Sequence, residues 1–141
     1  MLLATAQTIA TAALKYGRTK SMPPMTVAVL DAGGMLVAFA CEDNSSLLRE
    51  KIARGKASGA LNMGVGSRSL AARVESHPYF FGALAALSDG NVIPVAGGVL
   101  VRDAGGTLIG AVGVSGAQPD GDEAVAVAGI VAAGFVADPG E

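Results

Sequence analysis

The sequence predicts an α+β fold, and three observations lead to that prediction. The segments "VAVLDAGGMLVA" (27–38) and "VLVRDAGGTLIGA" (99–111) share one pattern: an apolar run, Asp-Ala-Gly-Gly and a second apolar run. The glycines supply the positive φ angles that a tight β-hairpin turn needs. The segments before, between and after these two patterns are helical in spacing or composition. We therefore expect two hairpins of one antiparallel sheet, with helices between and around them.

The first helix is expected over residues 2–16, where apolar side chains recur on one face. Gly17 is expected to end this helix, and a pair of prolines soon afterwards prevents its continuation. Two strands are expected next, at 26–30 and 35–40. Both are apolar on their two faces, which predicts that the sheet is covered on both sides.

Three helices are expected between the hairpins. Gly64 should end the first, Ser67 should cap the second, and Pro78 suits the first turn of the third. These helices are expected to cover residues 47–63, 67–75 and 79–87.

The rest of the chain is strand-like until a last helix, which is expected over 121–136. The strands are expected at 92–95, 98–103 and 107–114. The closing "DPGE" is interpreted as a tail. No linker interrupts these elements, and 141 residues suit a single domain, which we expect to span 1–141.

The composition predicts self-association. Hydrophobic residues make up 51% of the chain and charged residues only 16%. A domain of this size buries about two-thirds of its unfolded surface, so apolar area should be left over. The last helix is apolar nearly all round, and a neighbouring subunit is the simplest cover for its outer face. We therefore expect a homo-oligomer.

Other partners are not expected from the sequence. The formal net charge is −2 and no long basic run is present, which argues against nucleic acid. Cys41 is the single cysteine, so an internal disulfide is excluded and a reducing compartment is favoured. The N-terminus is a poor signal peptide, and the longest apolar stretch, 124–137, is too short to cross a bilayer. We expect a cytoplasmic protein without a membrane partner.

Taken together, these motifs resemble the GlcG/HbpS family of haem-degrading or haem-binding proteins, which is related to the C-terminal domain of PduO-type adenosyltransferases. The resemblance covers nearly the whole chain and is carried by both hairpins, the helix around "IARGKASGAL" (52–61), and "GTLIGAVGVSG" (106–116) followed by Asp122 and Glu123. It implies a profilin-like α/β/α three-layer domain with a five-stranded antiparallel sheet and helices on both faces. It also implies dimers that build larger rings, often octamers, and haem or corrinoid binding in some members.

The candidate site begins at the end of the last expected strand, where Ser115 and Gly116 precede Asp122 and Glu123. Carboxylates at this place can cap the last helix and complement its dipole. They can also line a site, and the resemblance matches Asp122 and Glu123 to an acidic pair of the family. Both interpretations stay open.

Two basic residues are candidates for the same site. Lys56 lies among apolar neighbours and matches the lysine of the family's "KA" motif. It could pair with Asp122 or Glu123, bind a carboxylate or act as a base, or it could form only a structural ion pair. Arg68 follows Gly64-Val-Gly66, which is either an anion-binding nest or an ordinary turn between helices.

His77, the only histidine, is the best candidate for an axial ligand of haem iron. Cys41, Tyr16, Tyr79 and the methionines are weaker candidates. A lone histidine before a helix is more often a surface or capping residue, and that interpretation stays open for His77. No cluster at zinc-site spacing is present. Gly97-Gly98 is expected at a bulge or edge where the backbone meets a partner or ligand.

Three functions agree with these patterns. The first is an oligomeric small-molecule binder for haem or another tetrapyrrole. The second is a cofactor-independent isomerase, lyase or hydrolase, with Lys56, Asp122 and Glu123 as catalytic groups and Arg68 as a binding group. The third is a non-catalytic accessory protein.

Overall fold

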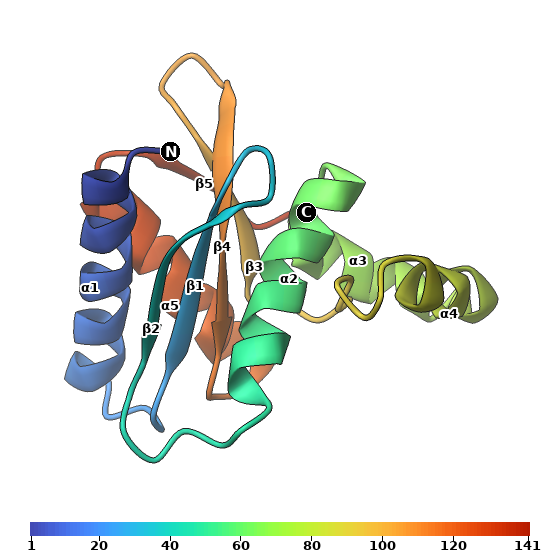
Figure 1. The fold of residues 1–141 in the computed structure, drawn as a ribbon, viewed down its shortest axis with the longest axis horizontal. Coiled ribbons are helices and arrows are strands. Elements are labelled where there is room, and N and C mark those ends of the chain that lie inside the picture. The colour runs from blue at the N-terminus through green and yellow to red at the C-terminus, as the bar shows by residue number, and fades with distance from the viewer.

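One antiparallel sheet runs through the centre of the computed structural model, which describes residues 1–141 (Figure 1). Its spatial order is β2-β1-β4-β3-β5, and every neighbouring pair is antiparallel. The strands are β1 (Thr26–Asp31), β2 (Leu36–Cys41), β3 (Gly98–Arg102), β4 (Leu108–Ser115) and β5 (Val136–Asp138). The predicted α+β fold with a five-stranded antiparallel sheet is confirmed.

The two expected hairpins are confirmed and are built in the same way. The Asp31 carboxylate accepts hydrogen bonds from the amides two and four residues later, each 2.9 Å long. Asp103 makes the same two bonds, also of 2.9 Å, in the second turn. Gly34 and Gly106 have φ angles of +86° and +87°, which other L-residues rarely adopt. The repeated sequence pattern therefore forms the same turn twice, and in each turn an aspartate accepts the same two backbone hydrogen bonds.

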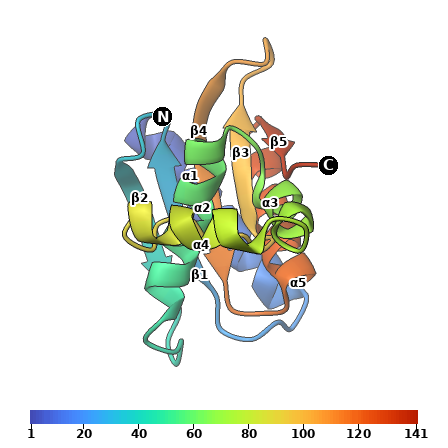
Figure 2. The ribbon, with the colours of Figure 1, turned by 90° about the vertical axis from the view of Figure 1, so that its right-hand side faces the viewer.

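Helices cover both faces of the sheet (Figure 1). α1 and α5 pack together on one face, and α2 lies on the other. α3 and α4 extend beyond α2, away from the sheet; in Figure 2 α4 lies across the front of the molecule. The helices are α1 (Leu3–Thr19), α2 (Arg49–Met63), α3 (Ser67–Val74), α4 (Pro78–Leu87) and α5 (Pro119–Ala132).

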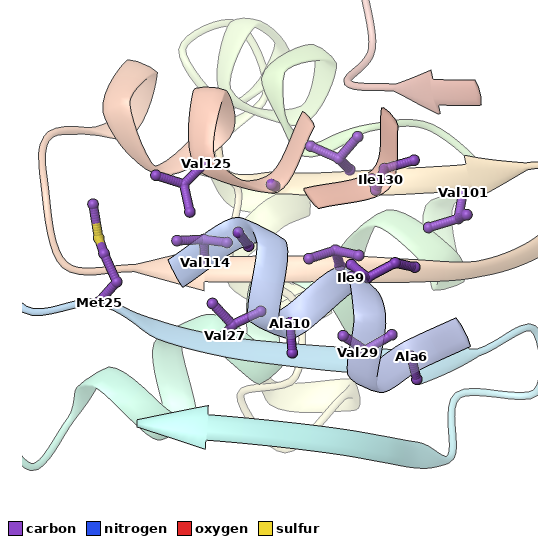
Figure 3. Packing of buried hydrophobic residues seen from close by; sticks show 14 residues of the cluster. Ala6, Ile9, Ala10, Met25, Val27, Val29, Val101, Val114, Val125 and Ile130 are labelled. Atoms are coloured by element: carbon purple, nitrogen blue, oxygen red, sulfur yellow. The ribbon is translucent and has the colours of Figure 1, made fainter. Parts of the chain in front are cut away.

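The larger part of the core lies between the sheet and the layer formed by α1 and α5 (Figure 3). Ile9 of α1 and Ile130 of α5 pack over valines that alternate along the strands, among them Val29 and Val114. The backbone of α1 comes so close to α5 that a Cβ at Gly129 would lie 2.6 Å from the Ile9 carbonyl oxygen. α1 of the same chain thus covers much of the second face of α5, where the sequence predicts a neighbouring subunit, and Val131 at the end of α5 stays exposed.

Small residues bring α2 unusually close to the opposite face of the sheet. A Cβ at Gly113 of β4 would collide with the carbonyl oxygen of Ala53, and one at Gly98 of β3 would collide with that of Lys56. Ala57 and other small residues of α2 are buried against this surface. The close packing fixes the position of α2, and with it the position of every side chain on its inner face.

α4 is the one helix whose apolar side chains stay largely uncovered. Phe81 is its only buried residue, whereas Tyr79 is 94% exposed and Leu87 is 82% exposed. Pro78 occupies its first turn as expected, and the chain leaves it through Asp89 and Gly90, which both have positive φ. α4 therefore presents an apolar surface that its own chain does not cover.

The expected strand at 92–95 is wrong. Pro94 has no amide hydrogen to give to a ladder, and the Ile93 amide donates to the carbonyl of Gly55 in α2 at 3.2 Å. A Cβ at Gly55 would lie 2.7 Å from the Ile93 side chain. The segment therefore lies across α2 as irregular chain and does not join the sheet.

Three element boundaries also differ from expectation. Gly17 does not end the first helix, because it lies buried inside α1 against Met25. Ser67 does not cap α3; its hydroxyl accepts a hydrogen bond of 2.7 Å from the Gly98 amide instead. α5 ends at Ala132, since the chain turns at Gly134 with a φ of +85°.

The closing residues are not a free tail. They begin in β5, which the sequence did not predict, and continue against α3. The Pro139 carbonyl accepts a hydrogen bond of 3.3 Å from the Arg68 amide, and Gly140 is buried against Gly66.

Candidate functional site

A buried ion pair joins α2 to the first turn of α5. Lys56 Nζ lies 2.8 Å from Asp122 Oδ2, and the two side chains are only 3% and 2% exposed. Lys56 also donates to the Val114 carbonyl at 3.1 Å, and Asp122 Oδ1 accepts from the Ala117 amide at 2.7 Å. Because both carboxylate oxygens accept hydrogen bonds, the arrangement suits the ionised form of Asp122.

Backbone geometry makes room for this pair. Gly97 has a φ of +116°, and a Cβ there would lie 2.9 Å from Lys56 Nζ and 2.9 Å from the Asp122 Cβ. Gly98, the next residue, is the place where the backbone of α2 rests on β3. The sequence predicts that the backbone meets a partner or ligand at these two glycines. The group that approaches them in the structure is α2 with its lysine.

Burial perturbs both members of the pair. Loss of hydration lowers the pKa of Lys56 from its ordinary 10.5, and the hydrogen bond that Lys56 donates to Asp122 opposes that change. Loss of hydration likewise raises the pKa of Asp122 above 3.8, against the effect of Lys56. Burial therefore brings the two pKa values closer together, which suits a pair that exchanges a proton with a bound molecule.

A cavity of about 290 Å³ opens beside the pair, between α2, the segment 93–95 and the start of α5. Its polar lining consists of Arg49, Lys56, Ser115 and Asp122. Its hydrocarbon lining comes chiefly from Ile52, Ile93, Val95 and Pro119. The cavity therefore combines apolar walls with a few convergent polar groups, as small-molecule sites commonly do.

Arg49 is the member of this site that sequence reasoning missed. Its Nη1 donates to Ser115 Oγ at 3.1 Å, and it forms no ion pair with a carboxylate. Its position seven residues before Lys56 places the two on the same side of a helix, and that spacing is the signal that could have identified it.

Glu123 and Arg68 lie together in a different cluster, at the surface. Arg68 Nε is 3.0 Å from each Glu123 carboxylate oxygen, and Arg68 Nη2 donates to Asp120 Oδ1 at 2.9 Å. These hydrogen bonds, with Glu123 first, raise the pKa of the Arg68 guanidinium. Of the residues expected to act together, the structure thus joins Lys56 with Asp122 and Ser115, and it joins Glu123 with Arg68.

The glycine-rich turn before Arg68 is filled by the chain itself. A Cβ at Gly66 would collide with Pro139, and the Arg68 amide already donates to the Pro139 carbonyl. Gly116, the remaining glycine of the candidate set, packs against the Pro24 carbonyl and Met25. Both glycines therefore serve close packing within the chain.

His77 is the residue that precedes α4, and it does not line the cavity. It is exposed, and the neighbouring Tyr79 and Phe80 are exposed as well. Cys41 is exposed on the edge strand β2. No three side chains of the His, Cys, Asp and Glu types gather into a group that could hold a metal ion.

Comparison with known proteins places these features in a family. A family model described as "Haem degrading protein HbpS-like" matches residues 1–131. None of the curated proteins matches the chain. The structure contains no helix with the length and apolar character needed to cross a bilayer.

Several solved structures share the fold. A PduOC–haem complex matches with a TM-score of 0.85 and 24% identity, covering 96% of each chain. HbpS matches with a TM-score of 0.79 and 26% identity, over 93% of this chain and 88% of that one. The ORFY protein of Klebsiella pneumoniae matches with a TM-score of 0.84 and 25% identity, over 95% of this chain and 90% of that one.

Proposed function

Since the chain belongs to the HbpS-like family, we propose that it is a small-molecule-binding protein that assembles with copies of itself and takes haem or a related tetrapyrrole. The family description supports the ligand class, and a structure with the same fold, PduOC, was solved as a haem complex. The observation that carries the proposal is the exposed imidazole of His77 beside the uncovered apolar surface of α4.

The donor chemistry at this surface fits haem. Imidazole is a common axial ligand of haem iron, and exposed aromatic rings at Tyr79 and Phe80 can contact a flat macrocycle. Bound haem would supply redox chemistry at its iron. The cavity beside Lys56, of about 290 Å³, lies at the lower end of the volumes that hold drug-sized ligands, so the open surface is the better place for a tetrapyrrole.

Titration with haemin tests this proposal. A saturable Soret band is expected, and His77→Ala should weaken the affinity and shift the band, because the axial nitrogen is lost. Cys41→Ala is the matched control and should leave the titration unchanged. A wild-type protein that gives no saturable spectral change would refute haem binding, and an unchanged His77→Ala titration would refute this ligand assignment.

We propose further that α4 forms part of the surface through which copies assemble into dimers and then larger rings, with an octamer as the expected size. Its exposed Tyr79, Phe80 and Leu87 are large apolar side chains on one helix, and exposed apolar patches commonly mark interaction surfaces. Leu87→Glu should lower the sedimentation coefficient in analytical ultracentrifugation, whereas Thr11→Glu on the outer face of α1 should not. A wild-type protein that sediments as a monomer at all concentrations would refute assembly.

A second candidate function is catalysis without a bound cofactor in the cavity beside Lys56 and Asp122. The buried pair, with its opposed pKa changes, supports general acid–base chemistry of the isomerase, lyase or hydrolase type. Exchange of carbon-bound hydrogen for deuterium in small carbonyl compounds, followed by NMR, tests this function. Catalysed exchange should disappear in Lys56→Met, and the absence of any exchange in the wild type would contradict it for proton-abstracting reactions.

We also infer a cytoplasmic location. The single, exposed Cys41 supports a reducing compartment. Fractionation of the producing cells tests this, and recovery outside the cytoplasm would overturn it.

A further inference from the structure

We propose that the cavity between α2, residues 93–95 and the start of α5 binds a small aliphatic monocarboxylate. Arg49 and Ser115 hold the carboxylate group, and Ile52, Ile93 and Val95 contact the hydrocarbon body. This inference deepens the second function proposed above, because it names the class of ligand for the same cavity. It does not depend on haem binding at α4.

The net charge of the cavity determines whether an anionic or a cationic ligand is favoured. Three charged side chains line it, and two of them, Lys56 and Asp122, neutralise each other at 2.8 Å. Arg49 is left as a half-buried cation without a carboxylate partner. A cation held against apolar walls and away from full hydration attracts an anion more strongly than an exposed cation does. The cavity therefore has one positive charge in excess.

Unused hydrogen-bond donors point to an oxyanion. Arg49 has five N–H groups and uses Nη1 on Ser115 Oγ, so its fork retains free donors. Ser115 accepts that bond and keeps its own hydroxyl hydrogen to donate. Lys56 has three N–H groups and gives two of them to Val114 and Asp122, so one remains. All three donors belong to residues that line the cavity, and a carboxylate has the acceptor capacity to satisfy them.

The rest of the cavity limits the ligand's body and total charge. Ile52, Ile93 and Val95 form apolar walls that favour a short hydrocarbon chain over a hydroxylated one. A second negative charge on the ligand would lie near Asp122 or against these walls, and both positions are unfavourable. A monocarboxylate with a short aliphatic chain therefore fits better than a dicarboxylate or a phosphate.

Isothermal titration calorimetry of the chain 1–141 tests the inference. The probes are butanoate, 3-methylbutanoate and hexanoate, with their neutral amides, succinate and inorganic phosphate as comparison compounds. At least one monocarboxylate should bind, and its amide should bind at least about tenfold more weakly, since it lacks the charge that Arg49 contacts. Failure of all three monocarboxylates at up to about 10 mM would overturn the inference. Tighter binding of succinate or phosphate would overturn the assignment to monocarboxylates.

Two arginine variants locate the site. Arg49→Gln should weaken monocarboxylate binding by about ten- to a hundredfold, because a charge-assisted hydrogen bond is lost. Arg54→Gln is the matched control: Arg54 lies on the same helix but is exposed and paired with Glu50. It should bind like the wild type. Equal affinity in wild type and Arg49→Gln, or equal losses in both variants, would overturn the inference, and circular dichroism of each variant verifies folding.

The same titrations separate this inference from the functions proposed above. His77→Ala should lose haem affinity and keep monocarboxylate binding. Arg49→Gln should show the opposite behaviour. Binding of a monocarboxylate without catalysed deuterium exchange would support the ligand site and contradict catalysis by proton abstraction.

Discussion

Replacement of Asp122 by asparagine should destabilise the protein severely. The substitution is nearly isosteric, and the new amide oxygen can still accept the hydrogen bond from Ala117. The Lys56 ammonium, however, loses its only carboxylate partner at 2.8 Å and faces an amide NH₂ group or an oxygen that is already used. With side chains 3% and 2% exposed, hydration from the cavity can replace the lost partner only in part.

The expected loss follows from that geometry. Breaking a buried ion pair by removing one partner costs about 3–5 kcal/mol, because an uncompensated charge stays buried. Domains are stable by only about 5–15 kcal/mol, so this loss removes a large share of the total stability. For a chain of this length, the loss lowers the melting temperature by about 10–17 °C.

Urea unfolding followed by circular dichroism measures the effect, with two comparison variants. Asp120→Asn makes the same chemical change two residues earlier, but Asp120 is 86% exposed and pairs with exposed Arg68, so its cost should stay below about 1 kcal/mol. The double variant Lys56→Met/Asp122→Asn removes the stranded charge. It should be more stable than Asp122→Asn alone, although it carries one substitution more. A double variant no more stable than the single one, or a single variant as stable as Asp120→Asn, would refute this reasoning.

Three further outcomes are expected. Gly113→Ala should lower the free energy of unfolding by about 3 kcal/mol or more, because the added methyl group meets the backbone of α2. The control, Gly82→Ala on the open surface of α4, should change it by less than about 1 kcal/mol. Thermal melts of both variants measure the difference. The pKa of Lys56 lies below 10.5 in the folded chain, so the unfolded chain binds more protons between the lowered pKa and pH 10.5. The contribution of this group to the free energy of unfolding therefore rises with pH in that window. Urea unfolding of the wild type and of the double variant at several pH values should show the difference. Gly97→Ala should separate Lys56 from Asp122 and weaken monocarboxylate binding at least about tenfold, and unchanged affinity in calorimetry would contradict the role given to that glycine.

The sequence was most informative where structure is decided locally. Each hairpin turn depends on an aspartate, two following amides and a glycine with positive φ, all within five residues, so "DAGG" was sufficient to predict it twice. Pro78 at the start of α4 and Gly64 at the end of α2 are local signals of the same kind. Family resemblance supplied the strand count and the layers.

Features decided by distant contacts were harder to predict. The apolar segment "VIPV" has the composition of a strand. It packs on α2 instead of joining the sheet, because Gly55 and Gly59 leave room there for Val92 and Ile93. β5 is only three residues long, and its residues lie where the sequence predicts the end of the last helix and the start of the tail. Asp122 and Glu123 are adjacent in sequence, yet one side chain reaches inward to Lys56 and the other outward to Arg68.

The glycines of β3 and β4 on which α2 packs determine how the cavity can be altered. Gly98 and Gly113 hold the helix backbone against the strands, so larger residues there would lift α2 and pull Lys56 away from Asp122. The opposite wall, at Ile93 and Val95, belongs to irregular chain that has no place in the sheet ladder. Efforts to re-engineer ligand size should therefore target Ile93 and Val95, where shorter aliphatic side chains would enlarge the cavity and leave its charged end intact.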